Sequence, residues 1–283
     1  MRILITGANG QLGRALYQRL QADNHAVTGV DRDTIDITDS LAVKTIFDAH
    51  HPELVIHCAA LTAVDYCAEH PEEALAVNGF GTQTVALACQ AHGAAMLYVS
   101  TNEVFDGTSL QPYREYDPPR PINPYGYSKW VGEQIVRDLL ARHYIVRTSW
   151  LFSHGGRNFV QTILRLAAQG EPLRVVTNEV GSPTYNDDLA AAISQLITTG
   201  CYGIYHLVNS GHVSRYGFAR HILDLAGLTD VPIEPIALAE FPRASRPPEY
   251  AVLCNMAGAR LGIVLRPWQD ALSAFVAAER GAE

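Results

Sequence analysis

Residues 2–13, RILITGANGQLG, form a short apolar run rich in β-branched residues, followed by a turn rich in glycine. Apolar side chains then recur at helical spacing from Leu12 to Leu20. This order of strand, glycine-rich turn and helix is the context of a dinucleotide-binding fingerprint. In that fingerprint Gly7 makes the tight turn, Gly10 lets the backbone approach a pyrophosphate, and Gly13 lets the helix pack closely on the strand. The helix N-terminus would face the phosphate charge.

The second apolar run, residues 26–30, ends at Asp31-Arg32. An acid at this place binds the ribose hydroxyls of NAD, whereas a nearby arginine accommodates the 2′-phosphate of NADP. Because both residues are present, the sequence leaves NADH and NADPH open. Asp36-Ile37 either cover the adenine ring or belong to the start of the next helix, for which Asp39 is the candidate cap.

Apolar strands and helical patterns alternate through the first half of the chain. Such alternation predicts an α/β fold with a Rossmann-type, doubly wound parallel sheet covered on both faces. Ligands of these sheets bind beyond the carboxyl ends of the strands. The predicted strands are 2–6, 26–30, 53–58, 95–100 and 143–147, and the predicted helices are 11–22, 40–49, 72–92 and 124–142.

The second half has a looser pattern with recurring proline-containing turns. We expect residues 1–150 to form an NAD(P)-binding domain and residues 151–283 to form mainly a small C-terminal substrate-binding lobe, without an easy core of its own. Some of its strands and helices are expected to return to the first sheet. The predicted elements are strands 173–176 and 203–208 and helices 157–168, 187–198 and 214–226.

The bulk composition excludes several classes of protein. A chain of 283 residues that is 48% hydrophobic can bury a large core, and its net charge of −8 argues against nucleic acid as the main partner. No uninterrupted apolar run approaches the roughly 18 residues of a membrane span, and the chain enters a strand without a signal peptide, so a cytoplasmic location is expected. The five cysteines have no C-x-x-C spacing, and no metal site or disulfide is expected.

A second motif places Tyr125 and Lys129 four residues apart, directly after the turn-forming Asn123-Pro124. In the first turn of a helix these two side chains share one face, although such pairs are also common on solvated surfaces. The lysine charge is predicted to lower the pKa of the Tyr125 phenol. Thr101 ends the fourth predicted strand and could orient a substrate carbonyl. Tyr125 could then protonate the carbonyl oxygen, while Lys129 stabilises the phenolate and holds the nicotinamide ribose.

The glycine fingerprint, the Thr101/Tyr125/Lys129 trio and the chain length resemble an extended short-chain dehydrogenase/reductase. The chain is most similar to the dTDP-4-dehydrorhamnose reductase family, and the matching segments span most of it in the expected order. These segments are residues 10–13, 36–39, 59–65, 104–107, 125–129, 147–150, 181–185 and 246–247.

The resemblance implies reduction of the C4 keto group of dTDP-4-dehydro-L-rhamnose by NADPH or NADH to give dTDP-L-rhamnose. Thr101, Asn102 and Trp150 would face the sugar, although Trp150 could instead be a core aromatic. Arg246 and Arg157 are the candidates for the diphosphate. Along the cofactor, the resemblance places Gly10, Gln11 and Leu12 at the pyrophosphate, Asp36 and Ile37 at the adenosine, Ala59, Ala60 and Leu61 along the cleft, and Tyr125 and Lys129 at the nicotinamide end.

Two departures from the family pattern matter. The family usually has Thr-Asp-Tyr where this chain has Thr101-Asn102-Glu103, which resembles the Thr-Asp-Glu signature of nucleotide-sugar 4,6-dehydratases. Asn102 cannot replace the aspartic acid that donates a proton in those enzymes. Arg14-Ala15 also lacks the glutamate that helps some members bridge a dimer through magnesium. A monomer and a homodimer therefore both remain open.

Two other functions remain as alternatives. Asn102-Glu103 leaves open another nucleotide-sugar reductase, epimerase or dehydratase. A protein of a different class, a non-catalytic NADP-binding regulatory subunit of a methionine adenosyltransferase, is opposed by the intact trio of Thr101, Tyr125 and Lys129.

Overall fold

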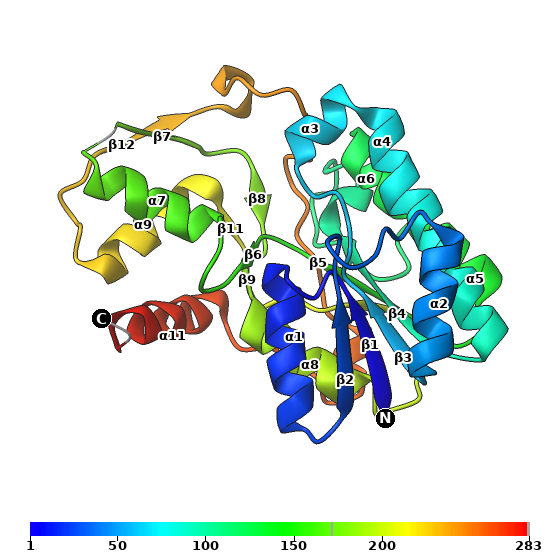
Figure 1. Ribbon diagram of the computed structural model, residues 1–283. Coiled ribbons are helices and arrows are strands. Elements are labelled where there is room, and N and C mark those ends of the chain that lie inside the picture. Colours follow the sequence, from blue (N-terminus) through cyan, green and yellow to red (C-terminus); the bar gives the residue numbers. More distant parts are fainter. Residues whose placement is uncertain (171, 282–283) are drawn as a thin grey trace.

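The structure is a computed structural model that describes residues 1–170 and 172–281. Its central sheet has six strands in the order β2-β1-β3-β4-β5-β10, and every neighbouring pair is parallel (Figure 1). The predicted Rossmann-type parallel sheet is therefore confirmed. The strand order reverses between β1 and β3, which is where such sheets bind ligands. The strands are β1 (Arg2–Thr6), β2 (Ala26–Val30), β3 (Leu54–His57), β4 (Ala95–Thr101), β5 (His143–Thr148) and β10 (Gly203–His206).

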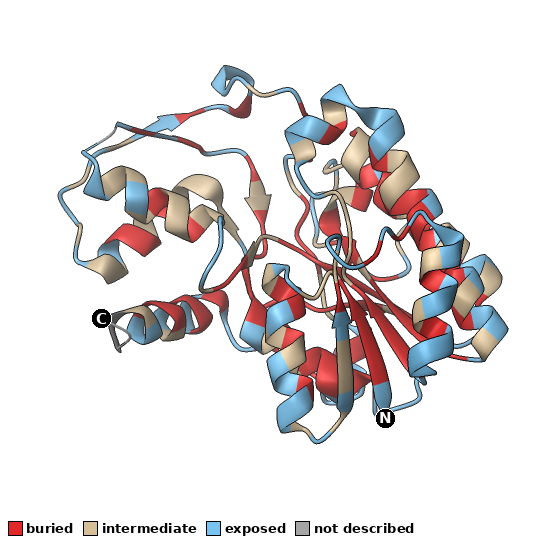
Figure 2. Cartoon of the chain, in the orientation of Figure 1, coloured by how far each residue is buried: buried red, intermediate tan, exposed pale blue. Residues whose placement is uncertain are grey.

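Side chains alternate between the two faces of the sheet, and helices cover both faces. In β1, Ile3 and Ile5 pack on one face with α1 (Gln11–Ala22) and α8 (Asn186–Leu196). Leu4 packs on the other face, which α2 (Ser40–His50), α5 (Thr82–His92) and α6 (Pro124–Leu139) cover. Figure 2 shows the buried strands between helices whose outer faces are exposed. Because both faces are covered, the central strands are nearly continuous apolar runs.

The first half departs from the predicted elements at two helices. The helix predicted over 72–92 consists of α4 (Pro71–Leu75), a π-helix η1 (Ala76–Gly81) and α5, and an unpredicted α3 (Val64–Glu69) precedes them. The helix predicted over 124–142 ends at Leu139, because Leu140 has the extended backbone angles φ −128° and ψ 120°. The other predicted elements of this half agree with the structure to within one residue at each end.

The second half does have a hydrophobic core of its own, so our expectation that it could not easily form one was wrong. Its members include Phe152, Phe218, Trp268 and Phe275, which lie on three segments that are far apart in the sequence. Helix α8 and strand β10 also belong to this half of the chain, but they pack with the central sheet. The elements of this half are β6 (Leu151–Phe152) paired with β9 (Thr184–Tyr185), β7 (Leu173–Val176) with β12 (Ile233–Ile236), β8 (Val180–Gly181) with β11 (Val213–Ser214), and α7 (Phe159–Ala168), α9 (Arg215–Ala226) and α11 (Trp268–Gly281).

Three short helices complete the fold, namely η2 (Asn102–Val104), η3 (Leu238–Glu240) and α10 (Ala257–Arg260). Within residues 1–170 and 172–281 no helix is long and apolar enough to cross a membrane. The same ranges contain no group of three or more His, Cys, Asp or Glu side chains placed to hold a metal ion. All five cysteines are free thiols.

Candidate active site

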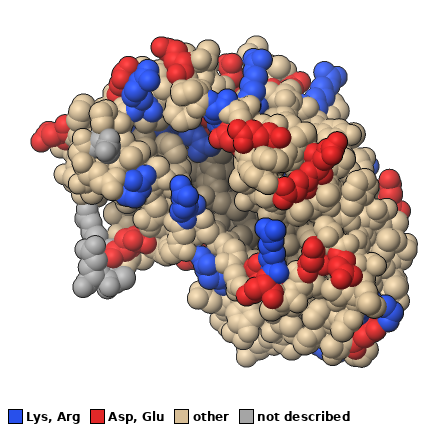
Figure 3. All heavy atoms as spheres, turned by 45° about the horizontal axis from the view of Figure 1, so that its top comes forward, with Lys and Arg blue, Asp and Glu red and all other residues tan. Residues whose placement is uncertain are grey.

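A cavity of about 990 Å³ opens beyond the carboxyl ends of the central strands. Figure 3 shows it as a hollow on the surface of the molecule. Every site residue predicted from the sequence lines this cavity except the two candidates for the diphosphate, Arg246 and Arg157. The side chain of Arg246 is exposed, and its backbone carbonyl accepts a hydrogen bond from the Asn123 side chain at 3.1 Å. Arg157, the other candidate for the diphosphate, is also exposed and does not line the cavity.

The glycine turn between β1 and α1 leaves no room for side chains. Gly7 has a φ of +71°, and a Cβ there would lie 2.7 Å from the Ala59 backbone nitrogen. A Cβ at Gly13 would lie 2.1 Å from the Gly7 carbonyl oxygen. Gly10 is the N-cap of α1, and no side chain caps the helix. The first N–H groups of α1 are therefore available to an anion, as a pyrophosphate site requires.

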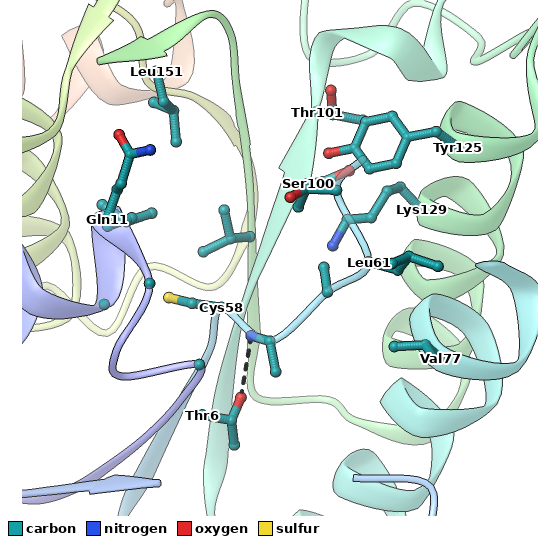
Figure 4. A pocket seen from close by; sticks show the side chains of 18 of the residues that line it. Thr6, Gln11, Cys58, Leu61, Val77, Ser100, Thr101, Tyr125, Lys129 and Leu151 are labelled. Atoms are coloured by element: carbon teal, nitrogen blue, oxygen red, sulfur yellow. Dashed lines mark hydrogen bonds between the residues drawn. The ribbon is translucent and has the colours of Figure 1, made fainter. Parts of the chain in front are cut away.

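The side chain of Gln11, which extends from the glycine turn (Figure 4), connects this turn to the second half of the chain. Its Nε2 donates a hydrogen bond to the Arg157 carbonyl at 2.9 Å, and its Oε1 accepts one from the Ser153 hydroxyl at 2.8 Å. Gln11 thus fixes the segment around residues 153–158 over the start of α1. Any role at the pyrophosphate would fall to its backbone, since these contacts occupy its side chain.

Asp31 and Arg32 have different surroundings at the end of β2. The Asp31 carboxylate accepts hydrogen bonds from the backbone N–H groups of Asn9 at 2.8 Å and Arg32 at 2.7 Å. The Arg32 guanidinium lines the cavity, and within the described residues no carboxylate lies within 4.0 Å of it. A free guanidinium can bind a phosphate, so this end of the cavity suits NADPH as well as NADH.

Asp36 and Ile37 line the cavity beside Arg32. Backbone and side-chain hydrogen bonds from Thr38 hold the pKa of Asp36 below its ordinary value. Asp39 caps α2 by accepting hydrogen bonds from two backbone N–H groups. The capping role that the sequence suggested for Asp39 is confirmed, and it leaves Asp36 and Ile37 facing the cavity.

The segment Ala59-Ala60-Leu61 forms the cavity wall between the glycine turn and α6. The Ala59 N–H donates a hydrogen bond to the Thr6 hydroxyl at 3.5 Å (Figure 4). Asn78, in the π-helix, accepts from the Leu61 N–H at 2.7 Å and donates to the Leu61 carbonyl at 3.0 Å. Its Nδ2 also donates to the Ser128 hydroxyl at 2.9 Å, which ties this wall to α6. Sequence reasoning missed Asn78, which lies within the stretch predicted as one continuous helix.

Helix α6 carries Tyr125 and Lys129 on one face, where they meet Thr101 at the end of β4 (Figure 4). Asn123 starts the helix by accepting a hydrogen bond from the Gly126 N–H at 2.8 Å. The Lys129 ammonium lies 4.1 Å from the centroid of the Tyr98 ring. The structure therefore brings together the trio that the sequence placed on two separate elements.

The pKa values at this trio differ from the expectation. Burial raises the pKa of Tyr125 well above 10.0, the nearby Glu103 charge raises it further, and a hydrogen bond with Thr101 opposes both. Burial lowers the pKa of Lys129 from 10.5 to about 7. The predicted lowering of the Tyr125 pKa by Lys129 was wrong, because both groups are deeply buried and the lysine is itself readily neutralised. A protonated Tyr125 nevertheless remains suited to donating a proton.

A buried ion pair lies beneath the trio and was not identified from the sequence. The Arg147 guanidinium donates two hydrogen bonds to Glu133, at 2.8 and 2.7 Å. The Ser100 hydroxyl, which also lines the cavity, donates to Glu133 at 2.6 Å. These contacts join β4, β5 and α6, and so fix the base of the site.

The residues after Thr101 are held from two sides. Asn102 is buried and donates a hydrogen bond to the Ala251 carbonyl at 3.3 Å. Glu103 lines the cavity, and its carboxylate accepts from the Asn123 side chain at 2.7 Å. Burial raises the pKa of Glu103 to about 6. An ionisable carboxyl group therefore stands in the cavity where the related pattern has tyrosine.

Trp150 and Arg215 line the cavity on the side of the second half. The Arg215 guanidinium lies 3.5 Å from the centroid of the Trp150 ring. Sequence reasoning missed Arg215, which starts α9 outside every recognised motif. Its only local signal was a basic residue at the start of a predicted helix.

Comparison with known proteins identifies the family of this chain. The family described as RmlD substrate binding domain matches residues 1–280. The chain belongs to this family. Its resemblance to dTDP-4-dehydrorhamnose reductases, inferred from the sequence, is confirmed by the relatives that follow.

Three of these RmlD relatives span nearly the whole chain. A dTDP-4-dehydrorhamnose reductase of Mycolicibacterium smegmatis is 39% identical over 285 residues, which cover 99% of this chain and 86% of the relative. A dTDP-4-keto-6-deoxy-D-glucose reductase of Streptomyces niveus is 37% identical, with 96% and 95% covered. The crystal structure of dTDP-4-dehydrorhamnose reductase from Bacillus anthracis in complex with NADP has a TM-score of 0.93 and 39% identity, with 97% and 98% covered.

Proposed function

We propose that this RmlD-family protein reduces the C4 keto group of dTDP-4-dehydro-L-rhamnose to give dTDP-L-rhamnose, with NADPH or NADH as its cofactor. The observation that carries the proposal is one cavity lined by the glycine turn and by Thr101, Tyr125 and Lys129. The names of the Mycolicibacterium smegmatis and Bacillus anthracis relatives support the same reaction.

The three side chains have distinct roles in this reaction. When bound, the cofactor supplies the hydride. Tyr125 stays protonated because burial raises its pKa, and it donates its proton to the carbonyl oxygen at C4. Thr101 donates a hydrogen bond that orients the same oxygen. Lys129, in its charged form, stabilises the phenolate that remains and holds the nicotinamide ribose.

The other cavity residues bind the two nucleotides. The backbone of residues 10–12 binds the cofactor pyrophosphate at the uncapped start of α1. Asp31, Arg32, Asp36 and Ile37 surround the adenosine, and Ala59, Ala60 and Leu61 line the cleft towards the nicotinamide. Asn102 and Trp150 face the sugar.

A reductase assay tests the proposal directly. Purified protein with dTDP-4-dehydro-L-rhamnose should consume NADPH or NADH, followed by the loss of the absorbance of the reduced nicotinamide. The product should be identified as dTDP-L-rhamnose by NMR. If neither NADPH nor NADH is consumed, the proposed reaction is refuted.

A second candidate is reduction of a different 4-keto sugar nucleotide. The name of the Streptomyces niveus relative and the replacement at Asn102-Glu103 favour this alternative. Assays that offer dTDP-4-dehydro-L-rhamnose and dTDP-4-keto-6-deoxy-D-glucose separately, at equal concentration, discriminate between the two. A higher kcat/KM for the second sugar would make it the substrate.

We further infer that the protein acts on this nucleotide sugar in the cytoplasm, as a monomer or homodimer and without nucleic acid. Its net charge of −8 supports the absence of a nucleic-acid partner.

A further inference from the structure

Basic side chains line the cavity at three points along the chain. Among the described residues that line it, the lysines and arginines are Arg32, Lys129 and Arg215. Arg32 follows β2 beside the predicted adenosine site, and Lys129 lies in α6 near Tyr125. A nucleotide sugar also carries a diphosphate, which arginine binds well through charge-assisted hydrogen bonds. Arg215 is the remaining candidate.

Arg215 is held in one orientation by Glu179. Its Nε and Nη2 both lie 2.9 Å from the same Glu179 oxygen, and its backbone N–H donates to the Glu179 carbonyl at 3.0 Å. Glu179 is nearly buried, whereas the Arg215 side chain is 22% exposed. A guanidinium has five N–H donors, so these contacts leave donors free for a ligand.

Trp150 fixes the guanidinium from a second direction. It has a φ of +46°, in the left-handed region that bulky residues rarely adopt. A Cβ at Gly181 would lie 2.5 Å from the indole, so Trp150 packs directly on the Gly181 backbone. Because Arg215 lies 3.5 Å from the ring centroid, this face of the indole packs on the cation, and contact with the sugar falls to the rest of the ring.

We propose that Arg215 binds the diphosphate of the nucleotide sugar, with Glu179 and Trp150 as its positioning residues. This inference rests on the proposed function, because it takes a sugar linked to a nucleoside diphosphate as the substrate. Planar guanidinium groups suit phosphate oxygens, which they can contact through two parallel N–H donors. Arg215 therefore takes the place for which the sequence offered Arg246 and Arg157.

The test compares Arg215→Gln with the wild-type full chain, using dTDP and thymidine as probes in calorimetric titrations. The loss of a charge-assisted hydrogen bond should weaken dTDP binding by about 10- to 100-fold, with thymidine binding unchanged. In turnover, KM for the nucleotide sugar should rise while KM for NADPH stays the same. Arg215→Lys should recover part of the dTDP affinity, because it restores the charge without the planar fork.

Two further variants separate binding from folding. Arg165→Gln removes the same charge from an exposed position of α7 in the same half of the chain, and it should leave dTDP binding unchanged. Arg215→Gln leaves Glu179 without its main partner, so the double variant Arg215→Gln/Glu179→Gln removes the stranded charge and should show the same loss of dTDP affinity.

Two results would overturn the role of Arg215. One is wild-type dTDP affinity in both Arg215→Gln and the double variant Arg215→Gln/Glu179→Gln. The other is an equal loss of dTDP and thymidine affinity, which would mean that Arg215 only supports Trp150. If dTDP binding depends on Arg215 but wild-type protein reduces no dTDP-4-dehydro-L-rhamnose, the proposed reaction fails and the diphosphate site stands.

Discussion

The buried charge of Lys129 is needed for activity but should destabilise the folded protein. Lys129→Met should therefore abolish activity and increase stability. The Lys129 side chain is almost completely buried, and burial lowers its pKa from 10.5 to about 7. Glu133 and Cys58 favour the charged form but do not offset the loss of hydration. Methionine keeps an unbranched stem of similar volume and removes the charge.

The magnitude follows from the difference between the folded and unfolded pKa values. A fall from 10.5 to about 7 corresponds to roughly 5 kcal/mol, of which about 4 kcal/mol applies at pH 7, where half of the folded molecules carry the proton. Between about pH 7 and pH 10.5 the unfolded chain binds more protons than the folded one, so wild-type stability should rise with pH. The advantage of Lys129→Met should therefore shrink by about 2 kcal/mol between pH 7 and pH 9.

Urea unfolding of both proteins without added cofactor, at pH 7, 8 and 9, measures this difference. The chain has only one other lysine, Lys44, which is exposed and paired with Asp48, so Lys44→Met is the matched control and should show no such dependence on pH. The argument from burial would be refuted by either of two results. The gain in the free energy of unfolding from Lys129→Met could be the same at every pH, or the variant could be less stable than wild type at every pH.

Three further predictions concern the site and its base. Tyr125→Phe should lower kcat by about 10²- to 10⁴-fold with cofactor binding retained, and nearly full activity would remove Tyr125 as the proton donor. Burial raises the pKa of Glu103 to about 6, so Glu103 loses its charge as the pH falls through 6. Because this charge repels the anionic nucleotide sugar, KM for that substrate should fall over the same pH range. Glu103→Gln should show the low KM at all pH values, and a pH profile like that of wild type would contradict this role. Arg147→Met leaves Glu133 buried without its partner and should lower the free energy of unfolding by about 3–5 kcal/mol, as measured in urea.

The features predicted well from the sequence are those that local chemistry determines. Strand β1 and helix α1 have the predicted bounds, because the apolar run, the glycine turn and the helical period lie within 21 consecutive residues. Thr101 could be placed near the glycine turn because parallel strands end at the same edge of a sheet. Local patterns and the edge of one sheet were sufficient to assemble most of the cavity.

The features that could not be predicted depend on tertiary packing. The pattern of residues 72–92 fits a continuous helix, and nothing in it distinguishes the π-helix in its middle, where the buried Asn78 contacts Leu61 and Ser128. Arg215 reaches the cavity through the packing of the second half, which no motif describes. The raised pKa of Tyr125 depends on its burial, which spacing relative to Lys129 cannot give.

The charges around Glu103 connect binding of the nucleotide sugar to proton donation. Arg215 and Arg243 lower the pKa of Glu103, although burial has the larger and opposite effect. A diphosphate at Arg215 would offset this positive field, so Glu103 should take up a proton when the substrate binds. Because the Glu103 charge raises the pKa of Tyr125, its loss makes the phenol a stronger acid. Tyr125 would thus become the better proton donor only when the substrate is in place.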